Sequence, residues 1–219
     1  MKKLFSVFCV MILSGVFAFA QTTGYKKGEF YVGYSNNQVD TGANSNTGNA
    51  ARDFFNDRLS FNGFEFSGVA NVSRYVGIKG DLSGTYRSRG FSQMTGTGTT
   101  TNTLSFNTRN SLYNFLGGVQ FKDNASTGTF KPFAHVLAGA GNYRTKVSNV
   151  TCSNTTITNC SSLAQTFSDT GFAAAFGGGL DIRAGDHVDV RAIQIDYNPI
   201  RVSGAIDHNF RFGFGLNFK

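Results

Sequence analysis

Hydrophobic and polar residues alternate along the last stretch of the chain, from residue 206 to residue 218. One face is apolar and mostly aromatic, with a single histidine: Ile206, His208, Phe210, Phe212, Phe214, Leu216 and Phe218. The other face carries only polar residues and glycine: Asp207, Asn209, Arg211, Gly213, Gly215 and Asn217. A period of two predicts a β-strand, and this one exceeds the roughly 9–11 residues that a tilted strand needs to cross a bilayer. The pattern predicts an aromatic face in lipid and a polar face toward a lumen.

The same alternation returns in seven earlier stretches. They begin near Phe30, Leu59, Val76, Leu104, Phe130, Phe172 and Val188. Small residues leave the orientation of the fifth stretch open. Long polar connections at 36–57, 87–103 and 146–169 alternate with short turns, as in barrels with long extracellular loops and short periplasmic turns. The expected fold class is all-β, an eight-stranded antiparallel up-and-down transmembrane β-barrel.

The seventh stretch changes phase halfway along its length. Apolar residues occupy one parity up to Ala192, after which Gln194 and Asp196 fall on that lipid face. A β-bulge near Ala192 and Ile193 would return both polar side chains to the lumen. Pro199 is expected to end the strand.

The N-terminus has the pattern of a secretory signal. Lys2 and Lys3 precede an apolar run over 4–16, and small residues at Ala18 and Ala20 form an A-x-A-like cleavage site. We therefore expect a signal peptide over residues 1–20 and a single barrel domain over residues 21–219.

The terminal strand also carries a spaced motif of a polar residue, a glycine and two hydrophobic residues. Its members are Arg211, Gly213, Leu216 and Phe218. The motif resembles the C-terminal targeting signal of bacterial outer-membrane proteins, which implies recognition by the barrel-assembly machinery during insertion. Lys219 departs from that pattern, because it follows the aromatic residue that usually ends such chains.

Together, the signal, strands, alternating loops and terminal motif resemble the small outer-membrane β-barrel family that includes the transmembrane domain of outer membrane protein A. The resemblance implies location in the outer membrane of a Gram-negative cell. It also implies contact with outer-membrane lipid and lipopolysaccharide, and a monomeric barrel. An extracellular ligand would meet the long loops, because loops on a rigid scaffold carry recognition.

Charged residues lie on the predicted lumen face in equal numbers of each sign. The acids are Glu65, Asp81, Asp181 and Asp189, and the bases are Lys79, Arg183, Arg191 and Arg211. Side chains alone fill an eight-stranded barrel, and charges held away from water must be paired. This predicts a polar plug and a structural or surface-interaction role, with a narrow pore for small solutes as the alternative.

Other candidate chemistry is sparse. Cys152 and Cys160 lie close together in a polar segment of an exported chain, which predicts a disulfide. The stretch between them holds no further metal-ligand side chain, so neither a metal nor a cofactor is expected. The formal charge of +7 falls to +5 without Lys2 and Lys3, and its scattered lysines and arginines do not indicate nucleic-acid binding.

Three histidines raise the question of a lipid-modifying barrel enzyme. His208 follows Ser203 closely, but there is no GxSxG motif and no paired-carboxylate signature. An interfacial residue is the simpler interpretation of His208, a turn residue of His187, and a packed or lumen residue of His135. Tyrosines near strand ends are expected to form interfacial girdles: Tyr31, Tyr75, Tyr86, Tyr113, Tyr143 and Tyr197.

Overall fold

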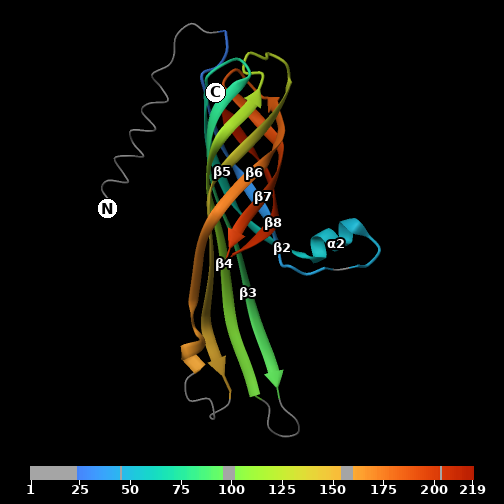
Figure 1. Ribbon diagram of the computed structural model, residues 1–219, viewed down its shortest axis with the longest axis vertical. Helices are drawn as coiled ribbons and strands as arrows, with labels where there is room; N and C mark the ends of the chain where they lie inside the picture. The colour runs from blue at the N-terminus through green and yellow to red at the C-terminus, as the bar shows by residue number, and fades with distance from the viewer. Residues whose placement is uncertain (1–23, 45, 96–101, 154–159, 203) are drawn as a thin grey trace, which may run out of the picture.

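The computed structural model describes residues 24–44, 46–95, 102–153, 160–202 and 204–219. Within them, eight antiparallel strands close into a barrel in chain order, with the first strand paired to the last (Figure 1). The strands are β1 (Gly28–Asp40), β2 (Arg58–Asn71), β3 (Val76–Thr95), β4 (Asn102–Lys122), β5 (Phe130–Cys152), β6 (Thr166–Arg183), β7 (Val188–Val202) and β8 (Ala205–Phe218). The predicted fold class is confirmed. The expected signal peptide, 1–20, lies outside the described residues.

The two ends of the barrel differ in their connections. The turns at 72–75, 123–129 and 184–187 lie at the same end as the C-terminus (Figure 1). At the other end lie the helix α2 (Ala50–Asn56) and the 3-10 helix η1 (Cys160–Leu163). The end with short turns is therefore the periplasmic one. No helix in the described part of the chain is long and apolar enough to cross a membrane.

The outer surface of the barrel is apolar. Large side chains that point outward and are exposed include Phe30, Phe66, Ile78, Phe115, Val136, Phe176, Ile195 and Phe214. Toward the extracellular end this surface finishes in a ring of mostly aromatic side chains, which we call the extracellular girdle: Tyr34, Phe64, Tyr86, Tyr113, Phe172, Tyr197 and Phe210. Polar residues follow at the next outward positions on most strands, such as Asn36 and Ser88. The girdle thus marks the outer edge of the hydrocarbon.

Two tyrosines expected in the girdles lie inside the barrel instead. Tyr31 is 1% exposed, and Tyr143 packs against Phe61 with ring centroids 6.3 Å apart. Each lies one position out of phase with the lipid-facing residues of its strand. Phe30 rather than Tyr31, for example, faces outward on β1.

The predicted bulge in β7 is confirmed. The pairing with β8 shifts register between Arg191 and Gln194, and both Gln194 and Asp196 are fully buried. The extra residue restores them to the lumen.

The prediction that Pro199 ends β7 is wrong, because the strand continues to Val202. The flanking pairs of β6 and β7 place Pro199 opposite Ala174. The carbonyl oxygen of Ala174 accepts a hydrogen bond of 2.6 Å from the Asn198 side chain. A side-chain amide therefore takes the place of the backbone N–H that proline lacks.

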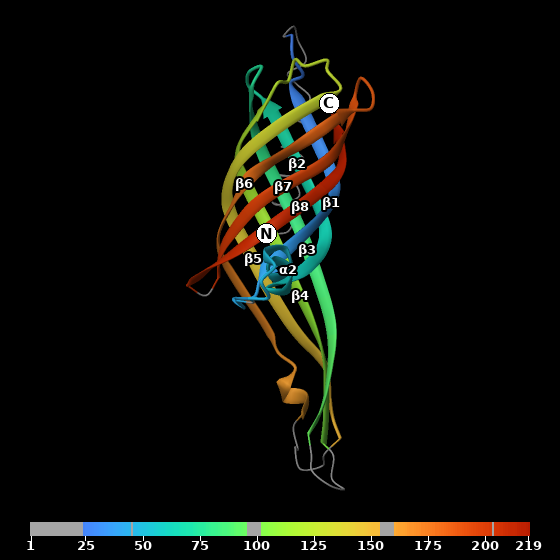
Figure 2. The same ribbon diagram turned by 90° about the vertical axis from the view of Figure 1, so that its right-hand side faces the viewer.

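Four strands run far beyond the others at the extracellular end (Figures 1 and 2). β5 has 23 residues whereas β1 has 13. We call residues 87–95, 102–110, 144–152 and 166–170 the β3–β6 extension. β3 has no β2 partner beyond Tyr86, and β6 has no β7 partner before Ala173. Much of the loops expected at 87–103 and 146–169 is therefore an open four-stranded sheet.

Candidate functional site

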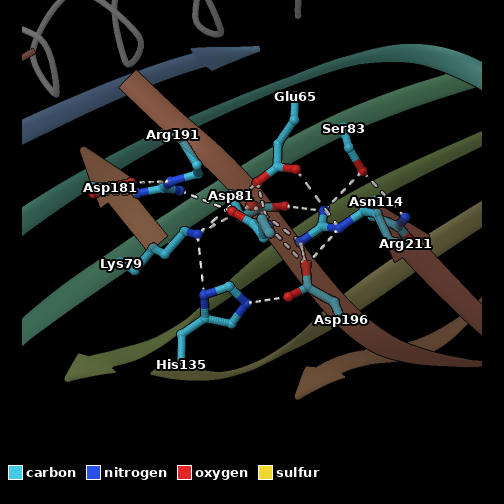
Figure 3. A network of polar contacts seen from close by, with 11 residues as sticks. Glu65, Lys79, Asp81, Ser83, Asn114, His135, Asp181, Arg191, Asp196 and Arg211 are labelled. Carbon is cyan, nitrogen blue, oxygen red and sulfur yellow. Dashed lines mark hydrogen bonds and ion pairs between the residues drawn. The ribbon is translucent and has the colours of Figure 1, made fainter. Parts of the chain in front are cut away.

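The periplasmic and middle parts of the lumen contain a network of buried charges, which we call the charged layer. Figure 3 shows the part of it around Arg211. Each of its members is at most 6% exposed. They are Glu29, Glu65, Lys79, Asp81, Lys122, Lys131, Asp181, Asp189, Arg191, Asp196 and Arg211.

Arg211, on β8, is the centre of this layer. Its guanidinium donates to Asp81 at 2.7 Å and to Asp196 at 2.7 Å. It also donates to the Ser83 hydroxyl at 3.2 Å, and Glu65 lies 3.8 Å away. One planar side chain with five donors thus joins four strands.

Lys79 and His135 continue the network around Asp81 and Asp196. The Lys79 ammonium lies 3.7 Å from Asp81 and 3.4 Å from His135 Nδ1. His135 Nε2 lies 2.8 Å from Asp196. A neutral imidazole that donates from Nε2 and accepts at Nδ1 satisfies both contacts. His135 is therefore a lumen residue.

A second set of pairs lies nearer the periplasm. Arg191 and Lys122 each contact Asp181 at 2.8 Å, and Lys122 also contacts Glu29 at 2.8 Å. The Arg191 guanidinium lies 4.3 Å from the centroid of the Tyr31 ring. Lys131 and Lys219 share Asp189 at 3.2 Å and 2.6 Å respectively. Lys219, the departure from the assembly motif, thus contributes to the periplasmic end of the network.

The charges of the layer balance when Lys219 is included. The six acids are Glu29, Glu65, Asp81, Asp181, Asp189 and Asp196, and the six bases are Lys79, Lys122, Lys131, Arg191, Arg211 and Lys219. Every one of these groups has a partner of opposite charge within 4.0 Å. Such a network leaves no net charge to select ions.

Seven of the eight lumen charges predicted from the sequence lie in this layer. Arg183 is the exception: its side chain is 38% exposed and contacts Asp186 at 2.6 Å. It is the last residue of β6, two positions beyond Asp181, where the strand leaves the barrel. Charged residues near strand ends were missed, namely Glu29, Lys122 and Lys131, although each has lumen parity.

Above the charged layer the lumen is mainly apolar, although buried asparagines such as Asn114 and Asn198 lie among the hydrophobic residues. This apolar layer consists of Val39, Phe61, Leu112, Leu116, Leu137, Ala173, Ala175 and Ile200. Phe61 is 0% exposed, and Leu59, Tyr143 and Val202 pack against the cluster. The expected plug is therefore polar only in part, and hydrophobic packing closes its extracellular side.

The inner face of the β3–β6 extension continues above the apolar layer. Phe91 and Phe106 stack across β3 and β4 with ring centroids 5.2 Å apart. A hollow of about 510 Å³ is lined by Tyr143, Phe167 and Val202, among others. Phe167 is 60% exposed. This face thus presents aromatic rings to the exterior.

The remaining candidate residues have simpler positions. Gly213 points inward toward the charged layer, where a Cβ would make only ordinary contacts of 3.4 Å, one of them with a Glu65 carboxylate oxygen. Leu216 and Phe218 face outward and are exposed. His208 stacks on Tyr197 at the outer surface, while its predicted neighbour Ser203 lies outside the described residues.

The cysteines lie at the extracellular end. Cys152 ends β5 and Cys160 begins η1. The Cys160 side chain is outside the described part, so the pairing stays a prediction. The described residues contain no group of three His, Cys, Asp or Glu side chains able to hold a metal ion.

A closed eight-stranded barrel with an apolar exterior and an ion-paired lumen defines an outer-membrane β-barrel. The chain belongs to the family "Outer membrane protein beta-barrel domain", whose model matches residues 7–218. The protein is therefore located in the cell outer membrane. No curated protein matches the sequence.

Solved structures of outer-membrane proteins are similar to this chain. The attachment invasion locus protein Ail of Yersinia pestis, in complex with the heparin analogue sucrose octasulfate, is 17% identical with a TM-score of 0.47, covering 88% of this chain and 100% of that one. Neisserial surface protein A is 10% identical with a TM-score of 0.48, covering 90% and 97%. OprG from Pseudomonas aeruginosa is 11% identical with a TM-score of 0.42, covering 89% and 97%. Because the sequence identities and TM-scores are this low, these three structures do not indicate what this protein binds.

Proposed function

We propose that this protein is a closed, monomeric barrel that anchors a binding surface, the β3–β6 extension, outside the cell. The observation that carries the proposal is the filled lumen. Arg211 and Phe61, the central residues of the two layers, are both 0% exposed. A barrel of this size has no room for a channel beside such side chains. Its function is then expected at the extracellular end, without catalysis or a cofactor.

The binding surface is the inner face of the extension. It combines the stacked pair Phe91 and Phe106 with the exposed Phe167. Arg89 adds a positive charge, with its guanidinium 5.1 Å from the centroid of the Phe91 ring. Exposed aromatic and arginine side chains are the residue types enriched where proteins bind partners.

Conductance tests the closed lumen. In planar bilayers the wild-type protein is expected to give no ohmic steps. Steps that change when Arg211 is replaced would contradict the closed lumen and favour the narrow pore for small solutes.

Adhesion tests the binding surface. Cells that display the wild type are compared, on immobilised extracellular proteins and polysaccharides, with cells that display Phe91→Ala/Phe106→Ala. The matched control is Ser92→Ala/Ser105→Ala, because this neighbouring cross-strand pair lies on the opposite face of the same two strands. Loss of adhesion is expected only for the phenylalanine pair. Equal adhesion of all three proteins would contradict this assignment.

The proposal also includes how the protein is exported and how the barrel is assembled. Residues 1–20 act as a signal removed on export, and residues 21–219 form the barrel. Arg211, Gly213, Leu216 and Phe218 are proposed to be recognised by the barrel-assembly machinery, and Cys152 and Cys160 to form a disulfide.

A further inference from the structure

Three basic side chains lie on the outward face of the β3–β6 extension, just beyond the extracellular girdle. Arg109 on β4 lies opposite Lys146 on β5, and Arg144 lies two residues from Lys146 on the same strand. The Arg109 guanidinium is 5.7 Å from the centroid of the girdle ring of Tyr86. We call Arg109, Arg144 and Lys146 the outward basic patch. It shares its face with the lipid-facing surface of the barrel.

The positive charge of this patch is not neutralised by the protein. All three side chains are exposed. In the described part of β3 to β6 beyond the girdle, the neighbouring outward positions hold serine, threonine, asparagine, glycine and methionine, without an acid. The lumen bases, in contrast, each have a carboxylate within 4.0 Å. The patch is therefore available to an anion outside the protein.

The height of the patch identifies the kind of anion. Arg109 lies four residues beyond the girdle residue Tyr113 on β4. At about 3.4 Å per residue and a tilt of about 40°, this places its Cα roughly 10 Å outside the hydrocarbon edge. Its side chain reaches back over Tyr86. The headgroup layer on each side of a bilayer is roughly 5–7 Å thick, so the guanidinium lies where lipid phosphates are found.

We propose that Arg109, Arg144 and Lys146 bind the phosphate groups of outer-leaflet lipopolysaccharide. Guanidinium groups match phosphate oxygens in a bidentate geometry. Three cations on neighbouring strands fit a lipid that carries more than one phosphate. This proposal goes beyond the proposed function, because the lipid site lies on the outward face of the extension, whereas the adhesion site lies on its inner face. Either proposal can fail while the other holds.

The test measures the affinity of the folded, full-length barrel for purified phosphorylated lipopolysaccharide in a zwitterionic detergent. Arg109→Gln/Arg144→Gln is expected to weaken binding about 30-fold, at roughly fivefold for each cation removed near an anionic surface. Adding Lys146→Gln is expected to weaken it by a further factor of about five. The affinity of the wild type should also fall with added salt. Heat-modifiable migration on a gel verifies that each variant is folded.

The matched control is Arg52→Gln/Arg74→Gln, which removes the same charge from α2 and from the periplasmic turn at 72–75. This control variant is expected to retain wild-type affinity for the lipopolysaccharide. Enzymatic dephosphorylation of the lipopolysaccharide should reproduce the loss of affinity seen in Arg109→Gln/Arg144→Gln. The proposal is overturned by equal losses in both pairs, by unchanged affinity in Arg109→Gln/Arg144→Gln, or by equally tight binding of the dephosphorylated lipid. Competition by inorganic phosphate at equal concentration would also overturn it, since the site would then be one for free phosphate.

Discussion

The charged layer and the apolar layer of the lumen lie in the same barrel but are stabilised by different interactions. In the charged layer, groups such as Arg211 and Asp81 have lost their water and depend on each other. In the apolar layer, Phe61 and Leu112 gain from leaving water and need only a good fit to their neighbours. Removing one member therefore leaves a buried charge in the first layer and a cavity in the second.

The two layers also differ in how strongly they specify the register of the strands. A shift by one residue would turn the lumen charges of a strand toward lipid, where charges are costly. At the level of the apolar layer, the same shift would only exchange one apolar residue for another, such as Leu112 for Tyr113. We infer that the charged layer determines the alignment of β7 and β8, whereas the apolar layer mainly fills space.

Deleting Ile195 is expected to have the largest effect. Asp196 would move by one position and face lipid, which separates it from Arg211. The barrel should then fail to form, as measured by the loss of heat-modifiable migration after refolding. Deleting Ala192 is the matched control and should leave a barrel that folds, because it removes the extra residue of the bulge and leaves Arg191, Gln194 and Asp196 in regular alternation toward the lumen. A folded Ile195 deletion variant would show that the charged layer does not determine the alignment of β7.

Replacing Arg211 by Met is expected to have the next largest effect. Asp81 and Asp196 would lose their closest cation, and breaking a buried pair in this way costs about 3–5 kcal/mol. Urea titration in detergent measures the free energy of unfolding. Adding Asp81→Asn and Asp196→Asn removes the orphaned charges and should recover part of the loss. A loss below about 1 kcal/mol, the usual range for an exposed pair, would show that Arg211 is not the centre of the layer.

Leu112→Ala should destabilise the apolar layer by about 3 kcal/mol, because it leaves a cavity that the barrel wall cannot close. Leu112→Met, which conserves volume, should cost less than about 1.5 kcal/mol. The same urea titration measures the free energy of unfolding of both variants and distinguishes them. Conductance should stay absent in both, since the charged layer still closes the lumen. Ohmic steps in Leu112→Ala alone would show that the apolar layer is the true seal.

The strands that contact lipid on one face could be predicted from the sequence. On β8, the apolar residues from Phe210 to Phe218 alternate with polar residues and glycine, because one face meets hydrocarbon and the other a polar lumen. The bulge at Ala192 could be predicted for the same reason, since Asp196 is not stable in lipid. The alternation also located the charges in the middle of strands, including Arg211 and Asp81.

Two regions could not be predicted because they lack that contrast. Residues 112–116 read Leu, Tyr, Asn, Phe, Leu, because the apolar layer puts hydrophobic residues inside the barrel as well as outside. Both faces of the β3–β6 extension contact water, so its sequence is rich in serine, threonine and asparagine and resembles that of a loop. Charges at strand ends, such as Glu29 and Lys131, were missed because the pattern does not define where the lumen begins.

Arg183 tests the periplasmic limit of the charged layer, and its replacement by Ala should have the smallest effect. It contacts Asp186 in a solvent-exposed turn, and its hydrogen bond holds the pKa of that carboxyl below its ordinary value. The contact can stabilise the fold only above the ordinary carboxyl pKa, and is lost as pH falls through the lowered pKa. Because solvent screens it, unfolding of Arg183→Ala at pH 7 should match the wild type, while the pKa of Asp186, followed by NMR, should rise. A loss as large as that of Arg211→Met would extend the charged layer to the periplasmic rim.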